Sequence, residues 1–176
     1  MIAYTIQIML IIFQLLLILF FLVTIIILVY SMLFGGPYAP IGEQKIEQML
    51  SLLKTKPKEI AADIGSGDGR IVIALAKKGV IAHGYELNPL LVLIARYKIR
   101  KAGLSKKAFI HMTDMWRVNY NQYDIITVYL APHVMKRLEK KLKPELKKSG
   151  RIAMNHYHFP NWKFKKRINN IYLYSK

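Results

Sequence analysis

The distribution of charge along the chain restricts its fold more than any other feature. No charged side chain occurs before Glu43, and the run from Ile2 to Phe34 is almost wholly apolar. The chain nonetheless carries 27 Lys or Arg against 10 Asp or Glu, a net charge of +17, all of it in the later part. A membrane-spanning helix needs about 20 apolar residues, and this run is longer. We therefore expect a membrane segment followed by a separate charged domain.

The end of the apolar run and the first charged residue predict a transmembrane helix over 1–34, a linker over 35–42 and a domain over 43–176. Gly35, Gly36 and Pro37 end the helix, because glycine loosens it and proline cannot continue it. A cleaved signal peptide is the alternative, but the run lacks a basic start and a small-residue cleavage site. Because every Lys and Arg follows the helix, we expect a single-pass membrane protein whose domain faces the cytoplasm.

Helix and strand patterns alternate after the linker. Helices are predicted over Ile41–Leu53, Arg70–Lys78, Pro89–Lys101 and Val134–Lys148, and strands over Glu59–Asp63, Ile81–Glu86, Ala108–His111, Asp124–Leu130 and Arg151–Tyr157. Two more strands should flank a turn at Asn169 and Asn170. This alternation predicts an α/β fold with a doubly wound parallel sheet, which binds ligands at the carboxyl ends of its strands.

The helix from Pro89 allows a specific prediction about its faces. Proline suits the first turn of a helix, and Gly103 ends this one. We expect Leu90, Leu93, Ile94 and Tyr97 to point inward, with Arg96 and Arg100 outward.

Glycines follow the first predicted strand and open the next helix, in the run from Asp63 to Arg70, Asp-Ile-Gly-Ser-Gly-Asp-Gly-Arg. Glycine lets the backbone turn sharply and approach a ligand. Glu86 ends the second strand, followed by Asn88, and a carboxylate there accepts hydrogen bonds from ribose hydroxyls. Asp114, just after the third strand, could accept from an adenine amino group.

The acidic residues distinguish between ligands for such a loop. Asp63, Asp68, Glu86 and Asp114 all fall at strand ends on one predicted edge of the sheet. Carboxylates there favour the sulfonium and ammonium groups of S-adenosylmethionine and repel the pyrophosphate of a dinucleotide. The alternative is a tight turn with surface acids in some other α/β protein.

These motifs resemble the class I S-adenosylmethionine-dependent methyltransferases over residues 41–176. Closer similarity is to the small membrane-anchored protein-lysine methyltransferases that modify adenine nucleotide translocase and the c subunit of ATP synthase. It rests on the glycine run and on the segments Gly36–Pro40, Tyr85–Pro89, Asp114–Trp116, Met135–Leu146 and Phe159–Trp162. The resemblance implies a Rossmann-like, seven-stranded, mostly parallel sheet and S-adenosylmethionine as cofactor.

The resemblance also implies the site residues. The cofactor residues would be Asp63, Gly65, Ser66, Gly67, Asp68, Gly69, Glu86, Asn88, Asp114 and Met115. The catalytic residues would be Tyr38, Tyr129 and Pro132. Two departures lie near the acceptor pocket: the chain has His156-Tyr157-His158 where the family has Arg-Phe-Pro, and Tyr129 to Pro132 differs in detail from its Phe-x-x-Pro.

A lysine acceptor must lose its proton in a desolvated pocket, and aromatic faces stabilise the charge that then develops on nitrogen. Tyr38, Trp116, Tyr129 and Trp162 are candidates for this role. Core packing or a place at the membrane interface is the alternative for each. His156 and His158 alone are too few for a metal site, so no metal is expected.

Other functions remain open because residues 131–176 hold 13 Lys or Arg and 2 acids, a net charge of +11. Such a surface fits anionic lipid or RNA, or is simply solvated. A protein-lysine acceptor is the leading hypothesis. Methylation of RNA, or of a small molecule or lipid, is the alternative, and a non-enzymatic membrane adaptor is disfavoured by the complete glycine run.

Overall fold

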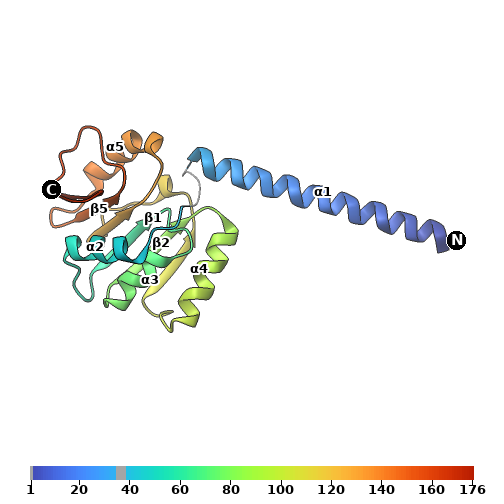
Figure 1. The fold of residues 1–176 in the computed structure, drawn as a ribbon, viewed down its shortest axis with the longest axis horizontal. Helices are drawn as coiled ribbons and strands as arrows, with labels where there is room; N and C mark the ends of the chain where they lie inside the picture. The colour runs from blue at the N-terminus through green and yellow to red at the C-terminus, as the bar shows by residue number, and fades with distance from the viewer. Residues whose placement is uncertain (1, 35–38) are drawn as a thin grey trace.

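The computed structural model describes residues 2–34 and 39–176, so Tyr38 lies outside the described residues. Helix α1, Ile2–Phe34, is one continuous rod (Figure 1). Its segment Tyr4–Ile27 has a mean hydropathy of 3.2 and is not buried against the rest of the chain. By length and composition, this helix is able to cross a membrane.

The remaining chain forms a seven-stranded sheet with the order β3-β2-β1-β4-β5-β7-β6. The first five strands along the chain are parallel, and β7 runs antiparallel to β5 and β6. The strands are β1 Ile60–Ile64, β2 Ile81–Glu86, β3 Ala108–Met112, β4 Ile125–Val128, β5 Arg151–Asn155, β6 Lys166–Ile168 and β7 Ile171–Ser175. The helices of this part are α2 Glu43–Leu53, α3 Arg70–Lys77, α4 Pro89–Lys101 and α5 Met135–Glu145, with short 3₁₀ turns at Met115–Arg117 and Pro132–Val134.

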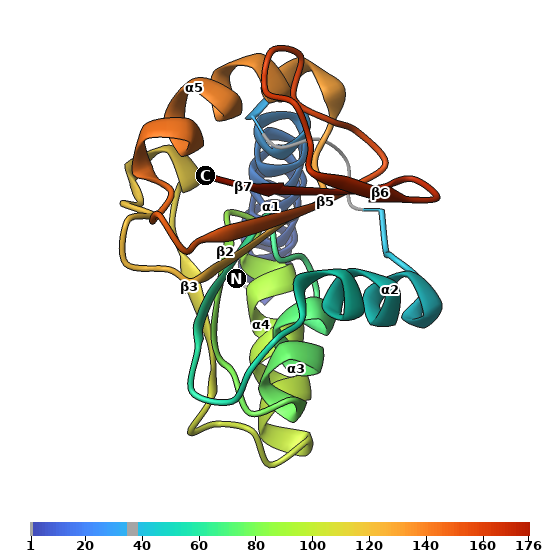
Figure 2. The same ribbon diagram turned by 90° about the vertical axis from the view of Figure 1, so that its left-hand side faces the viewer.

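Helices cover both faces of this sheet. Figure 2 shows α2, α3 and α4 on one side and α5 on the other. Each side has its own layer of buried apolar residues. Every residue of β4 is buried, as expected for a central strand of a parallel sheet, and its sequence does not alternate: it is apolar except for Thr127.

The predicted elements correspond closely to the observed ones. The bounds of β2 and α4 are those predicted, and Asn169, with φ of 52°, forms the turn between β6 and β7. Strand β5 ends at Asn155, earlier than predicted, so His156 and His158 lie beyond it rather than on a strand face. The mostly parallel, seven-stranded Rossmann-like fold is confirmed.

The prediction for the inward face of α4 is wrong. Leu90, Leu93 and Tyr97 are 63%, 61% and 60% exposed, whereas the side chains that pack against the sheet are Val92, Ala95 and Ile99. The helix has two apolar stripes, and hydrophobic periodicity alone does not say which one meets the sheet. The smaller side chains lie inward because Ala95 touches the glycine loop, where the closest packing occurs.

Gly84 in the middle of β2 provides a test of this packing. A Cβ there would lie 2.6–2.7 Å from atoms of Ser66 and Ile110, so Gly84→Ala should lower the free energy of unfolding by about 1–3 kcal/mol. Urea unfolding of the full chain in mild detergent, followed by tryptophan fluorescence, measures this, because both tryptophans lie outside α1.

Gly42→Ala is the matched control, since nothing lies within 4 Å of a Cβ at that position. Its effect should stay within about 0.5 kcal/mol. Equal stability of the two variants would contradict the close approach of Ser66 and Ile110 to β2.

Candidate functional site

The candidate site lies where the strand order changes direction, at the carboxyl ends of β1 and β4. Ligands of open α/β sheets bind at this point. The loop of residues 65–69 leaves β1 here and is closed against β2, because the backbone N–H groups of Gly65 and Ser66 both donate to the carbonyl of Tyr85, each at 3.0 Å. Gly65, Gly67 and Gly69 have φ of 72°, 53° and 78°, a region that favours glycine.

Packing adds a second reason for two of these glycines. A Cβ on Gly65 would lie 2.5 Å from Cδ2 of Leu130, and one on Gly69 would lie 2.9 Å from Cβ of Ala95. The segment after β4 and helix α4 therefore both press against the loop. Ser66 is buried with its side chain over Gly84, and its Oγ has no hydrogen-bond partner among the described residues. Its backbone N–H donates to the carbonyl of Tyr85 and its carbonyl accepts from Gly69, so its backbone already holds the loop.

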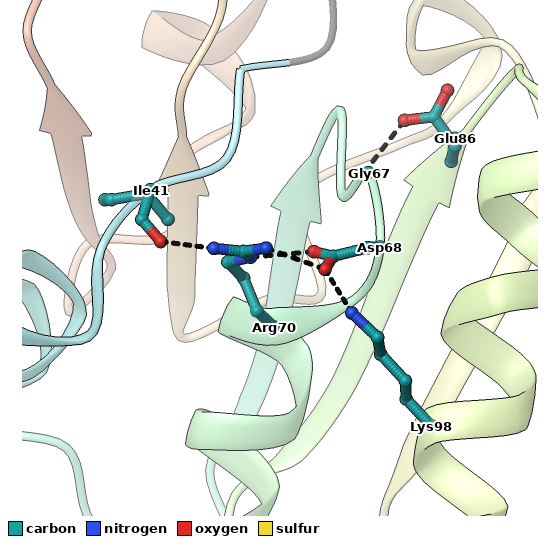
Figure 3. Close-up of polar contacts among 6 residues, drawn as sticks. All are labelled: Ile41, Gly67, Asp68, Arg70, Glu86 and Lys98. Atoms are coloured by element: carbon teal, nitrogen blue, oxygen red, sulfur yellow. Dashed lines mark hydrogen bonds and ion pairs between the residues drawn. The ribbon is translucent and has the colours of Figure 1, made fainter.

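The carboxylate of Glu86 spans the loop. Its Oε2 accepts from the N–H of Gly67 at 2.9 Å, and its Oε1 accepts from the N–H groups of Leu87 and Asn88, each at 2.8 Å. Figure 3 shows the bond to Gly67. Each carboxylate oxygen has two lone-pair directions, and three of the four are used, so the half-buried Glu86 keeps one of them, on Oε2, for a ligand hydroxyl.

Asp68, predicted as a cofactor residue, is bound by two cations of the chain itself. Its two oxygens are bound by Nε and Nη2 of Arg70, both at 2.9 Å, and Oδ2 also by Nζ of Lys98 at 2.5 Å (Figure 3). These cations hold the pKa of the Asp68 carboxyl well below its ordinary value. Nη1 of Arg70 donates to the carbonyl of Ile41 at 2.7 Å. Asp68 thus fixes the loop to α4 and to the chain that enters the domain.

Asp63 is the buried acid of the site. Its Oδ1 accepts from the Thr127 hydroxyl at 2.7 Å, an arrangement that follows from the pairing of these two residues across β1 and β4. Its Oδ2 is buried and has no hydrogen-bond partner among the described residues. Burial, and then the nearby Glu86 and Asp68, raise the pKa of Asp63 to about 7. Such a group favours a cationic partner.

The remaining predicted cofactor residues lie at the same edge of the sheet. Asn88 caps α4, with its Oδ1 accepting from the N–H groups of Leu90 and Leu91. Asp114 caps the turn after β3 by accepting from the N–H of Trp116 at 3.0 Å, and Met115 is buried behind it. Both caps order the loops at this edge of the sheet, and Asp114 keeps a second oxygen for a ligand.

Tyr129 follows β4 directly, and Pro132 begins the 3₁₀ turn three residues later. Tyr129 is half-buried and packs against the apolar layer on the side of α2 to α4, and Pro132 is exposed at the start of its 3₁₀ turn. Trp116 lies under the guanidinium of Arg137, 3.9 Å from the ring centre, and Trp162 stacks on Phe159. Trp162 therefore belongs to an aromatic cluster of the core.

Three residues at the site, Asn155, Thr127 and Lys98, were not predicted from the sequence. Asn155 ends β5 beside Tyr129, is 2% exposed, and both its Oδ1 and Nδ2 lack partners among the described residues. Thr127 orients Asp63, and Lys98 binds Asp68 from 30 residues away. No sequence motif marks them, because only the strand register and the helix packing bring them to the site. In the part of the chain that the structure describes, no three His, Asp or Glu side chains form a metal site.

The chain is similar in sequence to curated proteins. A human lysine N-methyltransferase named for the c subunit of ATP synthase is 41% identical over 126 residues, which are 72% of this chain and 54% of that protein. The chain thus spans about half the length of this curated relative. A protein-lysine N-methyltransferase of Saccharolobus islandicus is 30% identical over 148 residues, 78% of this chain and 92% of that one.

A solved structure extends the similarity to three dimensions. It is described as an RNA methyltransferase from Salinibacter ruber in complex with S-adenosyl-L-homocysteine, with a TM-score of 0.72, 26% identity, and coverage of 77% of this chain and 91% of that one. Residues 63–166, which hold the glycine loop, Glu86, Asp114 and Tyr129, match the model of the ANTKMT methyltransferase domain. The chain therefore belongs to the ANTKMT methyltransferase family.

Proposed function

We propose that this chain is an S-adenosylmethionine-dependent protein-lysine N-methyltransferase attached to a membrane by α1. The observation that carries the proposal is the unpartnered, buried carboxylate oxygen of Asp63 beside a glycine loop held by Glu86. An acid-lined pocket of this kind suits a methyl donor with a cationic amino-acid end.

The residues present fit this cofactor. Glu86 would hold a ribose hydroxyl, Asp63 the amino group, and Asp114 the adenine amino group, while Gly65 and Gly67 leave room for backbone approach. The cofactor supplies an electrophilic methyl group when bound. The chain's own part is mainly positioning, since an in-line displacement needs nucleophile, methyl carbon and sulfur held in one line.

The acceptor side is built from the segments after β4 and β5. A lysine amine must arrive neutral, and the apolar surroundings of Tyr129 favour the neutral form by desolvation. The free Oδ1 of Asn155 is suited to accept a hydrogen bond from this amine. Tyr129 and Pro132 would shape the opening, as would Tyr38, which lies outside the described residues.

Attachment to a membrane is supported by the apolar span Tyr4–Ile27 and by the basic surface of residues 131–176. Basic residues near a bilayer contribute about 1 kcal/mol each on anionic lipid. A single crossing with the charged domain on the cytoplasmic side follows from the positive-inside rule. A protein acceptor in or near the same membrane is then within reach of the site.

RNA is the second candidate acceptor. The net charge of +11 over residues 131–176 favours contact with phosphates, and the Salinibacter ruber structure is described as an RNA methyltransferase. The acceptor class therefore decides between the two functions.

A labelling experiment separates the two functions. Full-length protein in mild detergent is incubated with S-adenosylmethionine carrying a radioactive methyl group and a membrane lysate, and the products are treated with protease or RNase. The lysine proposal predicts label that protease releases and that hydrolysis yields as methyl-lysine. Label lost to RNase would replace that proposal with the RNA function.

Glu86→Ala tests the ribose contact. The variant loses a charged acceptor, so its affinity for S-adenosylhomocysteine in calorimetry should fall by about 100-fold, on the order of 3 kcal/mol. Glu47→Ala, which removes an exposed glutamate of α2, is the control and should bind normally. Unchanged affinity of Glu86→Ala would remove this residue from the site.

Asp63 makes cofactor binding depend on pH. Since Asp63 must be ionised to accept from an ammonium group and its pKa is about 7, affinity for S-adenosylhomocysteine should rise with pH up to about 7 and then level off. The slope below pH 7 should approach tenfold per pH unit. In Asp63→Asn this rise should be absent, and affinity should be lower than that of the parent chain at pH 8.

The raised pKa of Asp63 also makes the stability of the ligand-free chain depend on pH, but stability falls with rising pH whereas cofactor affinity rises. The folded chain keeps a proton on Asp63 between about pH 4 and pH 7 that the unfolded chain has lost, so this group lowers the free energy of unfolding as pH rises through that window. Asp63→Asn should therefore be more stable than the parent at pH 8 without ligand, by up to about 4 kcal/mol in urea unfolding. A less stable variant would contradict the unpartnered state of Asp63.

A further inference from the structure

Helix α4 carries apolar side chains on two opposite faces. Val92, Ala95 and Ile99 are buried against the sheet, whereas Leu90, Leu93 and Tyr97 are each at least 60% exposed. At 100° per residue, the exposed three fall within about 60° of one another on the side opposite the buried three. We call Leu90, Leu93 and Tyr97 the outer stripe. A helix that is apolar on both faces has two surfaces suited to burial, and the sheet covers one.

The outer stripe begins at the same edge of the sheet as the cofactor site. Asn88, two residues after Glu86, caps α4, so Leu90 lies in the first turn beside the end of β2. Met112, which ends β3 and pairs with Glu86, is 60% exposed at this edge. Leu90 and Met112 therefore lie at the carboxyl edge of the sheet, and Leu93 and Tyr97 continue the outer stripe along α4 toward the amino edge.

The sequence interval that holds the outer stripe carries charge of one sign, although Arg96 and Lys98 are already bound within the domain, to the carbonyl of Ile110 and to Asp68. No acid occurs between Glu86 and Asp114, and the basic residues in this interval are Arg96, Lys98, Arg100, Lys101, Lys106 and Lys107. Arg100 and Lys101 are exposed at the end of α4. Apolar side chains flanked by Lys and Arg are typical of helices that lie in the interface of an anionic bilayer, and tyrosine is enriched there.

The path of the chain brings this edge of the sheet close to the bilayer. Ile41 is buried and its carbonyl accepts from Arg70, at the start of α3 and at the carboxyl end of β1. Seven Cα–Cα steps separate Ile41 from Phe34, the last residue of α1, and cover at most about 25 Å. If α1 crosses a membrane, the carboxyl edge is the part of the domain tethered nearest to it.

We propose that the outer stripe of α4 inserts into the interfacial region of the anionic leaflet from which α1 emerges. Leu90 and Leu93 enter the acyl boundary, Tyr97 lies at headgroup level, and Arg100 and Lys101 bind lipid phosphates. The bilayer thus covers the second apolar face of α4 and holds the mouth of the cofactor site at the membrane surface. This inference rests on the membrane attachment proposed above and not on the acceptor.

Single-cysteine labelling tests the inference, because the chain has no cysteine of its own. Full-length Leu93→Cys, Thr24→Cys and Ser105→Cys carry an environment-sensitive fluorophore and are reconstituted into vesicles of phosphatidylcholine and phosphatidylglycerol. Thr24 lies within the apolar span of α1, and Ser105 is exposed at the opposite, amino edge of the sheet. Quenchers are spin-labelled lipids and aqueous iodide.

Lipid insertion predicts that the label at position 93 loses more than about half of its emission to spin-labelled lipid, and less in vesicles of phosphatidylcholine alone. The label at position 24 should be quenched by lipid in both vesicles, and the one at 105 by iodide only. If position 93 behaves like position 105 while position 24 is quenched by lipid, α4 docking is overturned and the anchor stands.

Other outcomes point to other occupants of the stripe. Protection of position 93 from iodide without lipid quenching would mean that a second copy or another protein covers α4, which also overturns the inference. Loss of lipid quenching at position 24 would overturn the membrane attachment itself. Neither result bears on cofactor affinity, which is measured separately.

Discussion

The structure depends on a left-handed glycine loop that is held from three sides. Leu130 and Ala95 leave no room for a Cβ at Gly65 and Gly69, and Glu86 holds the loop through the N–H of Gly67. Asp68, within the loop, binds Arg70 at the start of α3 and Lys98 in the last turn of α4, so the loop joins these two helices. Because Arg70 also binds Ile41, the segment leading from α1 is fixed to the same point.

These contacts explain how a strongly basic chain forms a site for a cationic ligand. Asp68 is neutralised within the domain, but Asp63 retains a buried oxygen without a partner among the described residues, and Glu86 and Asp114 keep lone pairs for hydroxyl and amino groups. Most other acids are engaged away from the site, as Glu59 is by Arg151 and Asp124 by Lys147. Negative charge is therefore concentrated at one edge of the sheet, although the chain as a whole is positive.

Much of the fold and the position of Glu86 could be predicted because they depend on short-range features of the sequence. Alternation of strands and helices, the glycine run and Pro89 after Asn88 each act within a few residues, so the bounds of β2 and α4 and the position of Glu86 followed from the sequence. The inward face of α4 did not, because Leu90, Leu93 and Tyr97 have the same helical spacing as Val92, Ala95 and Ile99. Larger side chains were the natural choice, but close packing against Gly69 selects Ala95.

Long-range contacts were beyond sequence reasoning. Lys98 is recognisable in the sequence only as part of a helix, yet it binds Asp68, and Thr127 and Asn155 are recognisable only as strand residues. Strand register places Thr127 beside Asp63 and Asn155 near Tyr129. The sequence therefore predicted residues for the cofactor half of the site, whereas Thr127 and Asn155 became visible as site residues only in three dimensions.

The central claim is that this pocket takes a positively charged adenosyl amino acid rather than a dinucleotide. Calorimetric titration of the purified full-length chain at pH 8 with S-adenosylmethionine, and separately with NAD, tests it most directly. The account predicts one bound S-adenosylmethionine per chain and no heat of binding with NAD. Binding of NAD without binding of S-adenosylmethionine would contradict it.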